Sequence, residues 1–427
     1  MDTVQQRPDY TFKFNNKLGR HGWLRLTPAY SVKLVREVID HLPEHAFILD
    51  PFSGTATTGL VAAEHDLSAH CFDINPFLIW LGNAKCRMYH KSELKTVEDG
   101  VHGVLAKYKK ILYQKNWLPN IHNITRWWNR HTLQILSALR QSLVDEFGEP
   151  DNNVAALAWI AFCRLIIETS SAAFNHVSMS FHEEAARFAA DQIESLYLEI
   201  FNRILQSADD LFTGSASVHF VDARDISAVD NVKYTHVITS PPYPNRISYI
   251  RELRPYMYWT KFLDSGREAG ELDWKAIGGT WGIATSRLQT WQSEAVETPY
   301  SLMPVVSRIM ESKGKNALLM ANYVWKYFHD MQVHLQSLRG HLSKGAVLCY
   351  IIGNSSFYGV LVPAEKLLEE SMNILGFANI GSKIVRKRNS KKELFEYCVY
   401  ATWQEERQYE PGFFGRSTAR QVQLSLF

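Results

Sequence analysis

The sequence predicts an α/β fold in which helices cover both faces of a mostly parallel sheet. Three observations favour it. Short apolar runs alternate with segments of helical period near the N-terminus, the same pattern returns after residue 217, and two strand-like runs precede a polar tail. Strands that alternate with helices along a chain form parallel sheets, because each helix carries the chain back across the sheet.

Two strand and helix pairs open the predicted sheet. Residues 46–50 form an apolar run that is too short for a helix, and the turn-forming residues 51–54 close it. A helix is expected from Thr57. Residues 69–73 form a second short strand, and residues 77–88 have helical period.

The alternation then breaks. Residues 91–211 are mostly helical in period, which predicts a helical insertion of subdomain size. Strands resume at 218–222 and 235–239. Residues 264–313 are rich in Gly, Ser, Thr and Trp without a sustained period, so we expect loops or a small subdomain there.

The last third of the chain completes the predicted sheet. Residues 324–342 have helical period, 346–352 form a buried strand, and 363–375 form a helix opened by its proline. Residues 380–385 and 395–403 are expected to form an antiparallel hairpin, whose intervening turn is strongly basic.

Composition bounds the function only weakly. The 427 residues suit two or three domains, and 46 basic against 44 acidic residues leave a net charge of +2, so a polyanionic partner is neither favoured nor excluded. Five separated cysteines without a C-x-x-C pair predict reduced thiols and no metal site. With no signal peptide or 20-residue apolar span recognised, we expect a cytoplasmic protein without a membrane segment.

Chemistry is expected at the carboxyl ends of the strands, where open α/β sheets bind ligands. Gly54 allows backbone N–H groups to approach a ligand closely, and Asp73 suits the two hydroxyls of a ribose because a carboxylate accepts from both. Taken singly, a glycine turn is equally well a plain structural turn, and a lone aspartate at a strand end is more often a turn former.

The four residues Ser240-Pro-Pro-Tyr243 follow a predicted strand and carry the strongest chemical signal. Two prolines remove two N–H donors and fix φ, so the Ser240 hydroxyl and the neighbouring carbonyls form a row of acceptors beside an aromatic ring. Such a row fits a planar heterocycle with an exocyclic amine that stacks on Tyr243.

These two segments resemble motifs of a known family. The sequence Asp50-Pro-Phe-Ser-Gly-Thr-Ala-Thr-Thr58 is similar to the cofactor motif of S-adenosylmethionine-dependent DNA amino-methyltransferases, and Thr239-Ser-Pro-Pro-Tyr243 resembles their catalytic motif. The resemblance implies a Rossmann-like class I methyltransferase sheet. Ser-Pro-Pro-Tyr is most typical of cytosine-N4 enzymes, whereas adenine-N6 enzymes more often carry Asp or Asn at the first position.

The resemblance also assigns binding residues for S-adenosylmethionine. The segment before the first motif is similar to one that holds the methionine end of the cofactor, and later strand ends match the acids that bind the ribose and read the adenine. The expected cofactor-binding residues are Thr27, Pro28, Tyr30, Asp50, Pro51, Phe52, Gly54, Thr57, Thr58, Asp73, Asn75, Asp222 and Asp225. Ala56 replaces the second glycine usual in this motif, which weakens cofactor binding unless its φ is negative.

The implied reaction is methyl transfer to the N4 amine of a cytosine flipped out of double-stranded DNA. Ser240 and Pro241 would accept the two amine hydrogens, with Pro242 shaping the loop and Tyr243 stacking on the base. The alternatives are an adenine-N6 DNA methyltransferase and, less favoured, an RNA or guanine-N2 methyltransferase or a catalytically idle specificity subunit. A restriction-modification or related defence role, with a cognate restriction endonuclease as partner, follows from the family only.

DNA contact is assigned to local basic residues, with a basic rim expected beside the catalytic loop. These are Arg246, Arg251, Arg254, Arg386, Lys387 and Arg388, with Lys391 and Lys392 in the same turn as the last three. A solvated face explains the terminal turn equally well. For Trp127, Trp128 and His131, core packing is favoured over a DNA-facing edge.

The expected organisation assigns roles to six segments. They are residues 1–90 as the first part of the core, 91–213 as a helical insertion and candidate DNA-recognition region, 214–263 as core with the catalytic loop, 264–320 as an irregular insertion and candidate target-recognition region, 321–405 as the remaining core, and 406–427 as a polar tail.

Overall fold

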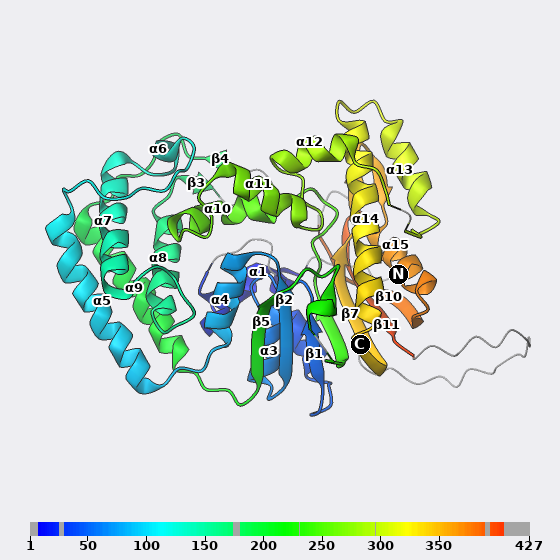
Figure 1. Cartoon of the computed structure of the whole chain (residues 1–427), viewed down its shortest axis with the longest axis horizontal. Coiled ribbons are helices and arrows are strands. Elements are labelled where there is room, and N and C mark those ends of the chain that lie inside the picture. Colours follow the sequence, from blue (N-terminus) through cyan, green and yellow to red (C-terminus); the bar gives the residue numbers. More distant parts are fainter. Residues whose placement is uncertain are drawn as a thin grey trace, which may run out of the picture.

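A seven-stranded sheet forms the centre of the computed structural model, which describes residues 7–24, 30–173, 180–229, 231–294, 296–388 and 393–404. Across the sheet the strands are β10 (Ala378–Lys387), β11 (Phe395–Thr402), β7 (Leu342–Gly353), β6 (Tyr234–Thr239), β1 (Phe47–Asp50), β2 (Ser68–Asp73) and β5 (Ser215–Phe220) (Figure 1). Only β11 is antiparallel to its neighbours, so the predicted parallel sheet and terminal hairpin are confirmed.

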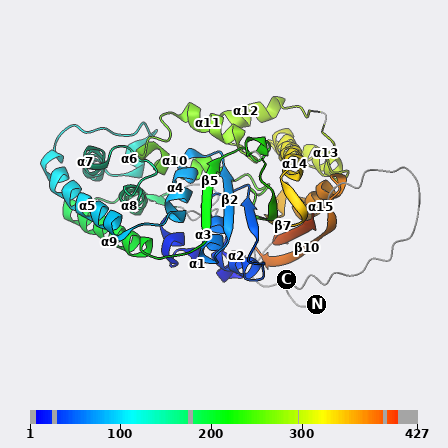
Figure 2. The same ribbon diagram turned by 60° about the horizontal axis from the view of Figure 1, so that its bottom comes forward.

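Helices cover both faces of the sheet, as predicted. Ile48 of β1 and Ile351 of β7 pack with α2 (Val32–Ile39) and α3 (Thr57–Glu64), whereas the adjacent Leu49 packs on the other face. That second face meets α14 (Ala317–Arg339) and α15 (Ala364–Ile374), which Figure 2 shows beside β7 and β10. Alternate strand residues are therefore apolar towards both layers, which gives an α/β sandwich.

The helical insertion joins the sheet after α4 (Pro76–Cys86). Its helices are α5 (Lys91–Ile111), α6 (Ile124–Trp127), α7 (Arg130–Phe147), α8 (Ala156–Glu168) and α9 (Ala190–Ala208), with a two-stranded pair of β3 (Ala172–Ala173) and β4 (Ser180–Phe181). This confirms the helical period of the segment. Trp127 and Trp128 are 5% and 0% exposed, so they pack in the core.

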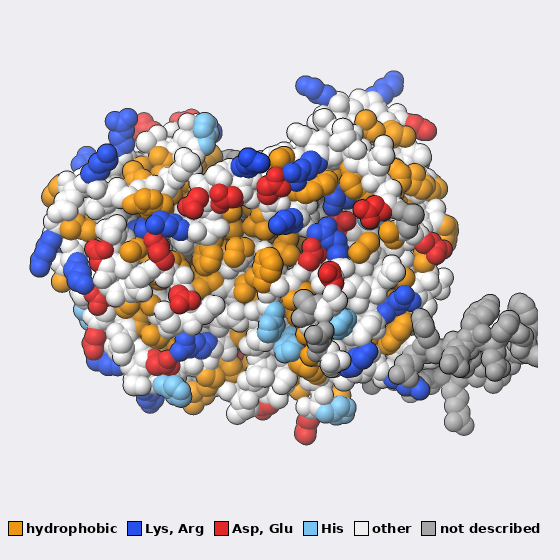
Figure 3. Space-filling model, viewed as in Figure 1, with side chains coloured by type: hydrophobic (Ala, Val, Ile, Leu, Met, Phe, Trp, Pro, Cys, Tyr) orange, Lys and Arg blue, Asp and Glu red, His pale blue; other side chains and the backbone are white. Residues whose placement is uncertain are grey.

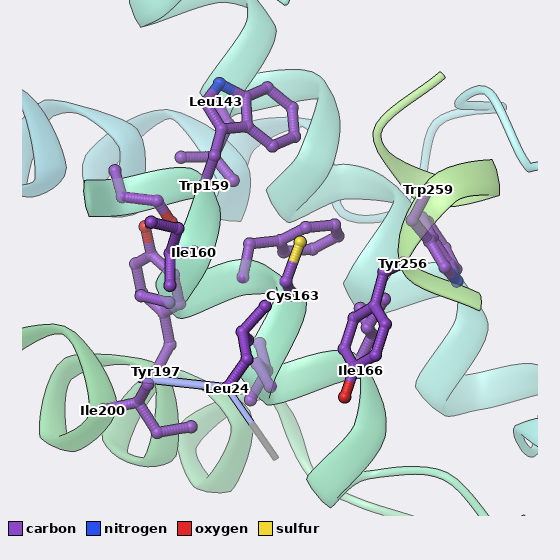
Figure 4. Close-up of a cluster of buried hydrophobic side chains, with 14 of the residues drawn as sticks. Leu24, Leu143, Trp159, Ile160, Cys163, Ile166, Tyr197, Ile200, Tyr256 and Trp259 are labelled. Carbon is purple, nitrogen blue, oxygen red and sulfur yellow. The ribbon is translucent and has the colours of Figure 1, made fainter. Parts of the chain in front are cut away.

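The insertion shares one hydrophobic core with α4 and with α10 (Tyr249–Trp259), the helix that follows the catalytic loop. Figure 4 shows Trp159 and Cys163 of α8 and Tyr197 of α9 in the same cluster as Tyr256 and Trp259 of α10. The buried Arg140 strengthens the join, because its Nε donates to the backbone oxygen of Trp259 at 2.9 Å.

Residues 264–313 were expected to form loops or a small subdomain, and the structure shows three short helices there. They form α11 (Gly266–Lys275), α12 (Ile283–Thr290) and α13 (Leu302–Met310), of which α11 and α12 cross the top of the molecule in Figure 1. Helices this short show too few turns for an apolar period to emerge. The usable signal was local: Ser265 and Glu268 form a capping pair at the start of α11.

The remaining elements are short. They are the 3-10 helices Pro8–Tyr10, Gly19–Gly22 and Ile226–Ala228, the helix α1 (Phe12–Asn15), and the two-stranded pair of β8 (Ser355–Phe357) and β9 (Val360–Val362). All five cysteines are buried free thiols. Within the described residues, no helix combines the length and apolar character that a bilayer crossing needs, and no three or more His, Cys, Asp or Glu side chains gather as metal ligands.

Candidate functional site

A pocket of about 520 Å³ lies at the carboxyl ends of the parallel strands. Its wall is formed by the loops after β1, β2, β5 and β6, by α10 and the end of α11, and by the β10–β11 hairpin. The predicted cofactor and catalytic segments therefore open into one cavity. The predicted residues in its lining are Tyr30, Pro51, Phe52, Gly54, Thr57, Asp73, Asn75, Asp222, Ser240, Pro241, Pro242, Tyr243, Arg386 and Arg388.

The loop after β1 and the end of β2 are joined through one carboxylate. The backbone N–H of Gly54 donates to Asp73 Oδ2 at 3.0 Å, and that of Asn75 donates to Asp73 Oδ1 at 2.8 Å. Gly54 has φ +51°, in the left-handed region that favours glycine. Burial raises the pKa of Asp73 to about 7, although both backbone hydrogen bonds oppose the shift.

Asp50 and Thr58 lie outside the pocket lining, beneath the loop. Asp50 is fully buried, and its Oδ1 accepts from Thr239 Oγ1 at 2.5 Å and from the N–H of Phe52 at 3.1 Å. Burial raises the pKa of Asp50 to about 6. Thr58 bonds the Tyr30 hydroxyl and the carbonyl of Ile238. In this arrangement both residues hold the loop against β6.

Ala56 occupies the position where the motif usually has glycine, and its φ and ψ are 56° and 36°. The sequence left open a negative φ, which the structure does not have. A left-handed alanine costs roughly 1–2 kcal/mol. Its methyl group is fully buried with Leu60 and Val218, and this packing offsets part of the cost.

The acids after β5 have different positions. Asp222 lines the pocket, and its two carboxylate oxygens accept from Arg224 Nε at 3.0 Å and Nη2 at 2.7 Å. Asp225 is exposed, lies outside the lining, and caps the next 3-10 turn by accepting from Ser227. The structure therefore brings only Asp222 of this pair to the cavity.

Three hydrogen bonds to other elements fix the Ser240-Pro-Pro-Tyr243 loop. Ser240 Oγ donates to the carbonyl of Ile351 at 3.1 Å, which leaves the hydroxyl oxygen able to accept. The Tyr327 hydroxyl donates to the carbonyl of Pro242 at 2.7 Å. The N–H of Tyr243 donates to the hydroxyl of Tyr249 at 3.3 Å.

The ring of Tyr243 is held at its edge and on one face. Its hydroxyl donates to Glu396 Oε1 at 2.7 Å, and the guanidinium carbon of Arg388 lies 5.1 Å from the ring centroid. Burial, reinforced by Glu396, raises the pKa of Tyr243 well above its usual value, so the hydroxyl keeps its proton. The orientation of this ring is thus set by the hairpin.

The basic residues predicted to contact DNA fall into two groups. Arg386 and Arg388 line the pocket, whereas Lys387 lies outside its lining and pairs with Glu393 at 2.9 Å. Arg246, Arg251 and Arg254 also lie outside the lining. Arg246 is exposed with φ +67°, and Arg254 stacks on Trp281 at 4.4 Å. On the face shown in Figure 3, Lys and Arg lie among Asp and Glu.

Thr27, Pro28, Lys391, Lys392 and the polar tail lie outside the described residues. Conversely, the sequence did not point to Glu396, Tyr249 or Tyr327, which hold the catalytic loop. Only Glu396 carried a usable signal, because strand alternation places this charged residue on the same buried face as Cys398.

The lining fits S-adenosylmethionine. Asp73 and Asp222 both line the cavity, and their carboxylate oxygens are acceptors of the kind that hydroxyl and amine hydrogens require. A Cβ at Gly54 would approach no atom closer than 3.9 Å outside its chain neighbours, so the backbone leaves open space there.

In comparisons with known proteins, the chain is similar to methyltransferases. The model of the D12 class N6 adenine-specific DNA methyltransferase family matches residues 32–221, less than half of the chain. Type II methyltransferase M.BsoBI of Geobacillus stearothermophilus is 20% identical over 91% of this chain and 84% of its own length. Type II methyltransferase M.AvaI of Nostoc sp. is 21% identical over 91% of this chain and 87% of its own length. Type II methyltransferase M.MvaI of Kocuria varians is 20% identical over 82% of this chain and 80% of its own length.

Among solved structures, the rRNA methyltransferase aviRa of Streptomyces viridochromogenes aligns over 88% of this chain and 86% of its own, at 12% identity and a TM-score of 0.29. The seven-stranded sheet with helices on both faces, and the pocket at the carboxyl ends of its parallel strands, fit the predicted Rossmann-like methyltransferase fold, for which S-adenosylmethionine is the methyl donor. The family and relative matches support a DNA amino-methyltransferase.

Proposed function

We propose that this protein methylates the N4 amine of a flipped cytosine in double-stranded DNA, with S-adenosylmethionine as donor, within a restriction-modification or related defence system. The observation that carries the proposal is the shared pocket. Ser240 and Pro241, a pair of acceptors for an amine, line the same cavity as Gly54 and Asp73 of the cofactor side. The methyl donor and the amine can therefore bind side by side in one cavity.

The protein's own contribution is orientation. The Ser240 hydroxyl donates a hydrogen bond to the carbonyl oxygen of Ile351. Its oxygen would accept a hydrogen bond from one amine hydrogen, and the Pro241 carbonyl would accept one from the other. These bonds aim the nitrogen lone pair and strengthen as positive charge develops on the nitrogen. When bound, S-adenosylmethionine supplies a methyl group whose bond to sulfur breaks as the bond to nitrogen forms, with release of one amine proton.

Tyr243 would contact the base with the ring face opposite to Arg388. Asp73 would bind the ribose of the cofactor and Asp222 its adenine, while Gly54 and Tyr30 border the rest of the cofactor. Arg386 and Arg388, being part of the wall, would contact the flipped nucleotide, and the exposed Arg246 would contact the duplex. We assign target recognition to the region of α11 to α13 or to the helical insertion.

An adenine-N6 specificity is the second candidate, and the D12 family match favours it. That match ends at Val221, before the Ser240-Pro-Pro-Tyr243 loop, so it concerns the half of the chain that holds the cofactor motif. The loop itself, with serine first, favours cytosine. The relatives' shared designation as Type II methyltransferases supports the restriction-modification setting and a cognate endonuclease as a partner.

The test is to incubate unmethylated bacterial DNA with the protein and S-adenosylmethionine, digest it to nucleosides, and identify the products by mass spectrometry. N4-methylcytosine is expected. N6-methyladenine would replace the cytosine assignment by the second candidate. DNA without either product, in a sample that binds the cofactor by calorimetry, would favour an idle specificity subunit instead.

A further inference from the structure

Glu396 is a buried carboxylate in the pocket wall to which the proposed reaction gives no part. The residue is 3% exposed and belongs to β11. Its Oε1 accepts from the Tyr243 hydroxyl at 2.7 Å and from Arg386 Nη2 at 3.1 Å, and its Oε2 accepts from Arg386 Nε at 2.8 Å. Burying a carboxylate is costly unless such bonds satisfy it, so these contacts define its position.

The strand order explains why this carboxylate reaches the catalytic loop. Because β11 runs antiparallel to β7, its first residues lie at the carboxyl end of β7, and Glu396 pairs with Gly353. The carboxyl end of the neighbouring β6 leads into Ser240. The reversed strand therefore delivers Glu396 to the edge at which the proposed chemistry occurs.

Gly353 provides the space in which this arrangement forms. A Cβ at this position would lie 2.3 Å from Arg388 Nη1 and 2.9 Å from Tyr243 Cδ2. Arg388 itself donates to the carbonyl of Asn354 at 2.8 Å. The end of β7 thus accommodates both the aromatic ring and the cation beside it, and Glu396 holds the hydroxyl at the far end of that ring.

We propose that Glu396 is a positioning residue for methyl transfer, whose carboxylate holds the Tyr243 hydroxyl so that the ring and the Ser240-Pro-Pro-Tyr243 loop keep the orientation that receives the target base. This inference rests on the proposed function. It does not involve the cofactor side, because Glu396 contacts Tyr243 and Arg386 rather than Gly54 or Asp73.

A double-mutant cycle tests the proposal. Glu396→Gln keeps an acceptor oxygen but removes the charge, and Tyr243→Phe keeps the ring but removes the hydroxyl. Each is expected to lower the single-turnover rate of methyl transfer to DNA by about tenfold, the effect of one charge-assisted hydrogen bond. The double variant should be no more than about twofold slower than the slower single variant, because Tyr243→Phe already removes the hydroxyl through which Glu396 is proposed to act.

Three further measurements separate positioning from a general structural role. The Kd for S-adenosylmethionine, measured by calorimetry, should stay within about twofold in all variants, because Glu396 and Tyr243 are proposed to act on the target base and not on the cofactor. Glu369→Gln is the matched control: it changes a glutamate that pairs with Lys366 on α15, outside the pocket lining, and should leave the rate unchanged. Thermal melting of each variant shows whether the fold is retained.

The outcomes are distinct. Multiplicative losses, about a hundredfold slower in the double variant, would overturn the proposal because Glu396 would then act independently of Tyr243. A Glu396→Gln rate equal to that of the unaltered protein would also overturn it. If the unaltered protein transfers no methyl group to any DNA, both the proposed function and this inference fail. A failure of this inference alone leaves the unaltered protein active, so the two results are distinguishable.

Discussion

Asp73 Oδ2 accepts a hydrogen bond of 3.0 Å from the backbone N–H of Gly54, which joins the end of β2 to the loop that follows β1. The carboxylate therefore joins the two loops between which the cofactor is proposed to bind. Because burial raises the pKa of Asp73 to about 7, this carboxyl group is partly protonated near neutral pH.

Cofactor affinity should consequently depend on pH. A protonated Asp73 accepts hydrogen bonds poorly, so binding requires loss of its proton, and affinity rises with pH until Asp73 is ionised. For a pKa of about 7, the Kd at pH 6 should be about tenfold higher than at pH 8. Calorimetric titration across this range measures it. Asp73→Asn should bind weakly with a much smaller pH dependence; an unchanged dependence would assign the proton to another group.

Removal of the Ser240 hydroxyl should impair chemistry more than binding. Ser240→Ala loses one acceptor for the amine, and we expect the single-turnover rate to fall by about tenfold to a hundredfold. The Kd for S-adenosylmethionine should change little, since Ser240 bonds Ile351 rather than Asp73 or Gly54. Methylation by this variant at the rate of the unaltered protein would contradict the assignment.

Space at Gly353 should be required for methyl transfer. Gly353→Ala introduces a Cβ that would lie 2.9 Å from Tyr243 Cδ2, and the ring must shift, so the rate on DNA should drop by at least about tenfold. Gly340→Ala is the control, because a Cβ there has no neighbour nearer than 3.8 Å and the backbone is right-handed helical. Similar rates for both variants would argue against a constrained ring.

Because Ala56 has a left-handed backbone, the effect of a substitution there on the free energy of unfolding should depend on the shape of the new side chain. Ala56→Gly relieves strain but loses a buried methyl group and adds chain entropy, so the free energy of unfolding should change by less than about 1 kcal/mol. Ala56→Val places a β-branched side chain at φ 56° in a filled core and should destabilise by about 2–4 kcal/mol. Urea unfolding measures both; a tolerated valine would show that the loop readjusts.

The fold was accessible from the sequence because each strand of the sheet is a short apolar run that ends in a polar or turn-forming residue. Asp50, Asp73 and Ser240 were found in this way, and the shared pocket follows from the parallel strand order. The terminal hairpin was likewise predicted from two apolar runs around a basic turn.

What the sequence could not provide were contacts between distant segments. Tyr249 and Tyr327 bind the catalytic loop from two helices, and nothing in their local sequence distinguishes them from core tyrosines. The same holds for Arg224, whose guanidinium donates to Asp330 and to the carbonyl of Lys275, both far away in the sequence. Backbone conformation was also hidden, since φ at Ala56 depends on how the loop closes against its neighbours.

The helical insertion and α10 pack in one hydrophobic core. Trp259 and Tyr256 pack among insertion residues, so excision of residues 91–213 would expose apolar side chains of the helix that follows the catalytic loop. The insertion cannot be removed or exchanged as an independent unit. A substitution in the insertion that disturbed this packing would also disturb α10, and through α10 the Ser240-Pro-Pro-Tyr243 loop that precedes it.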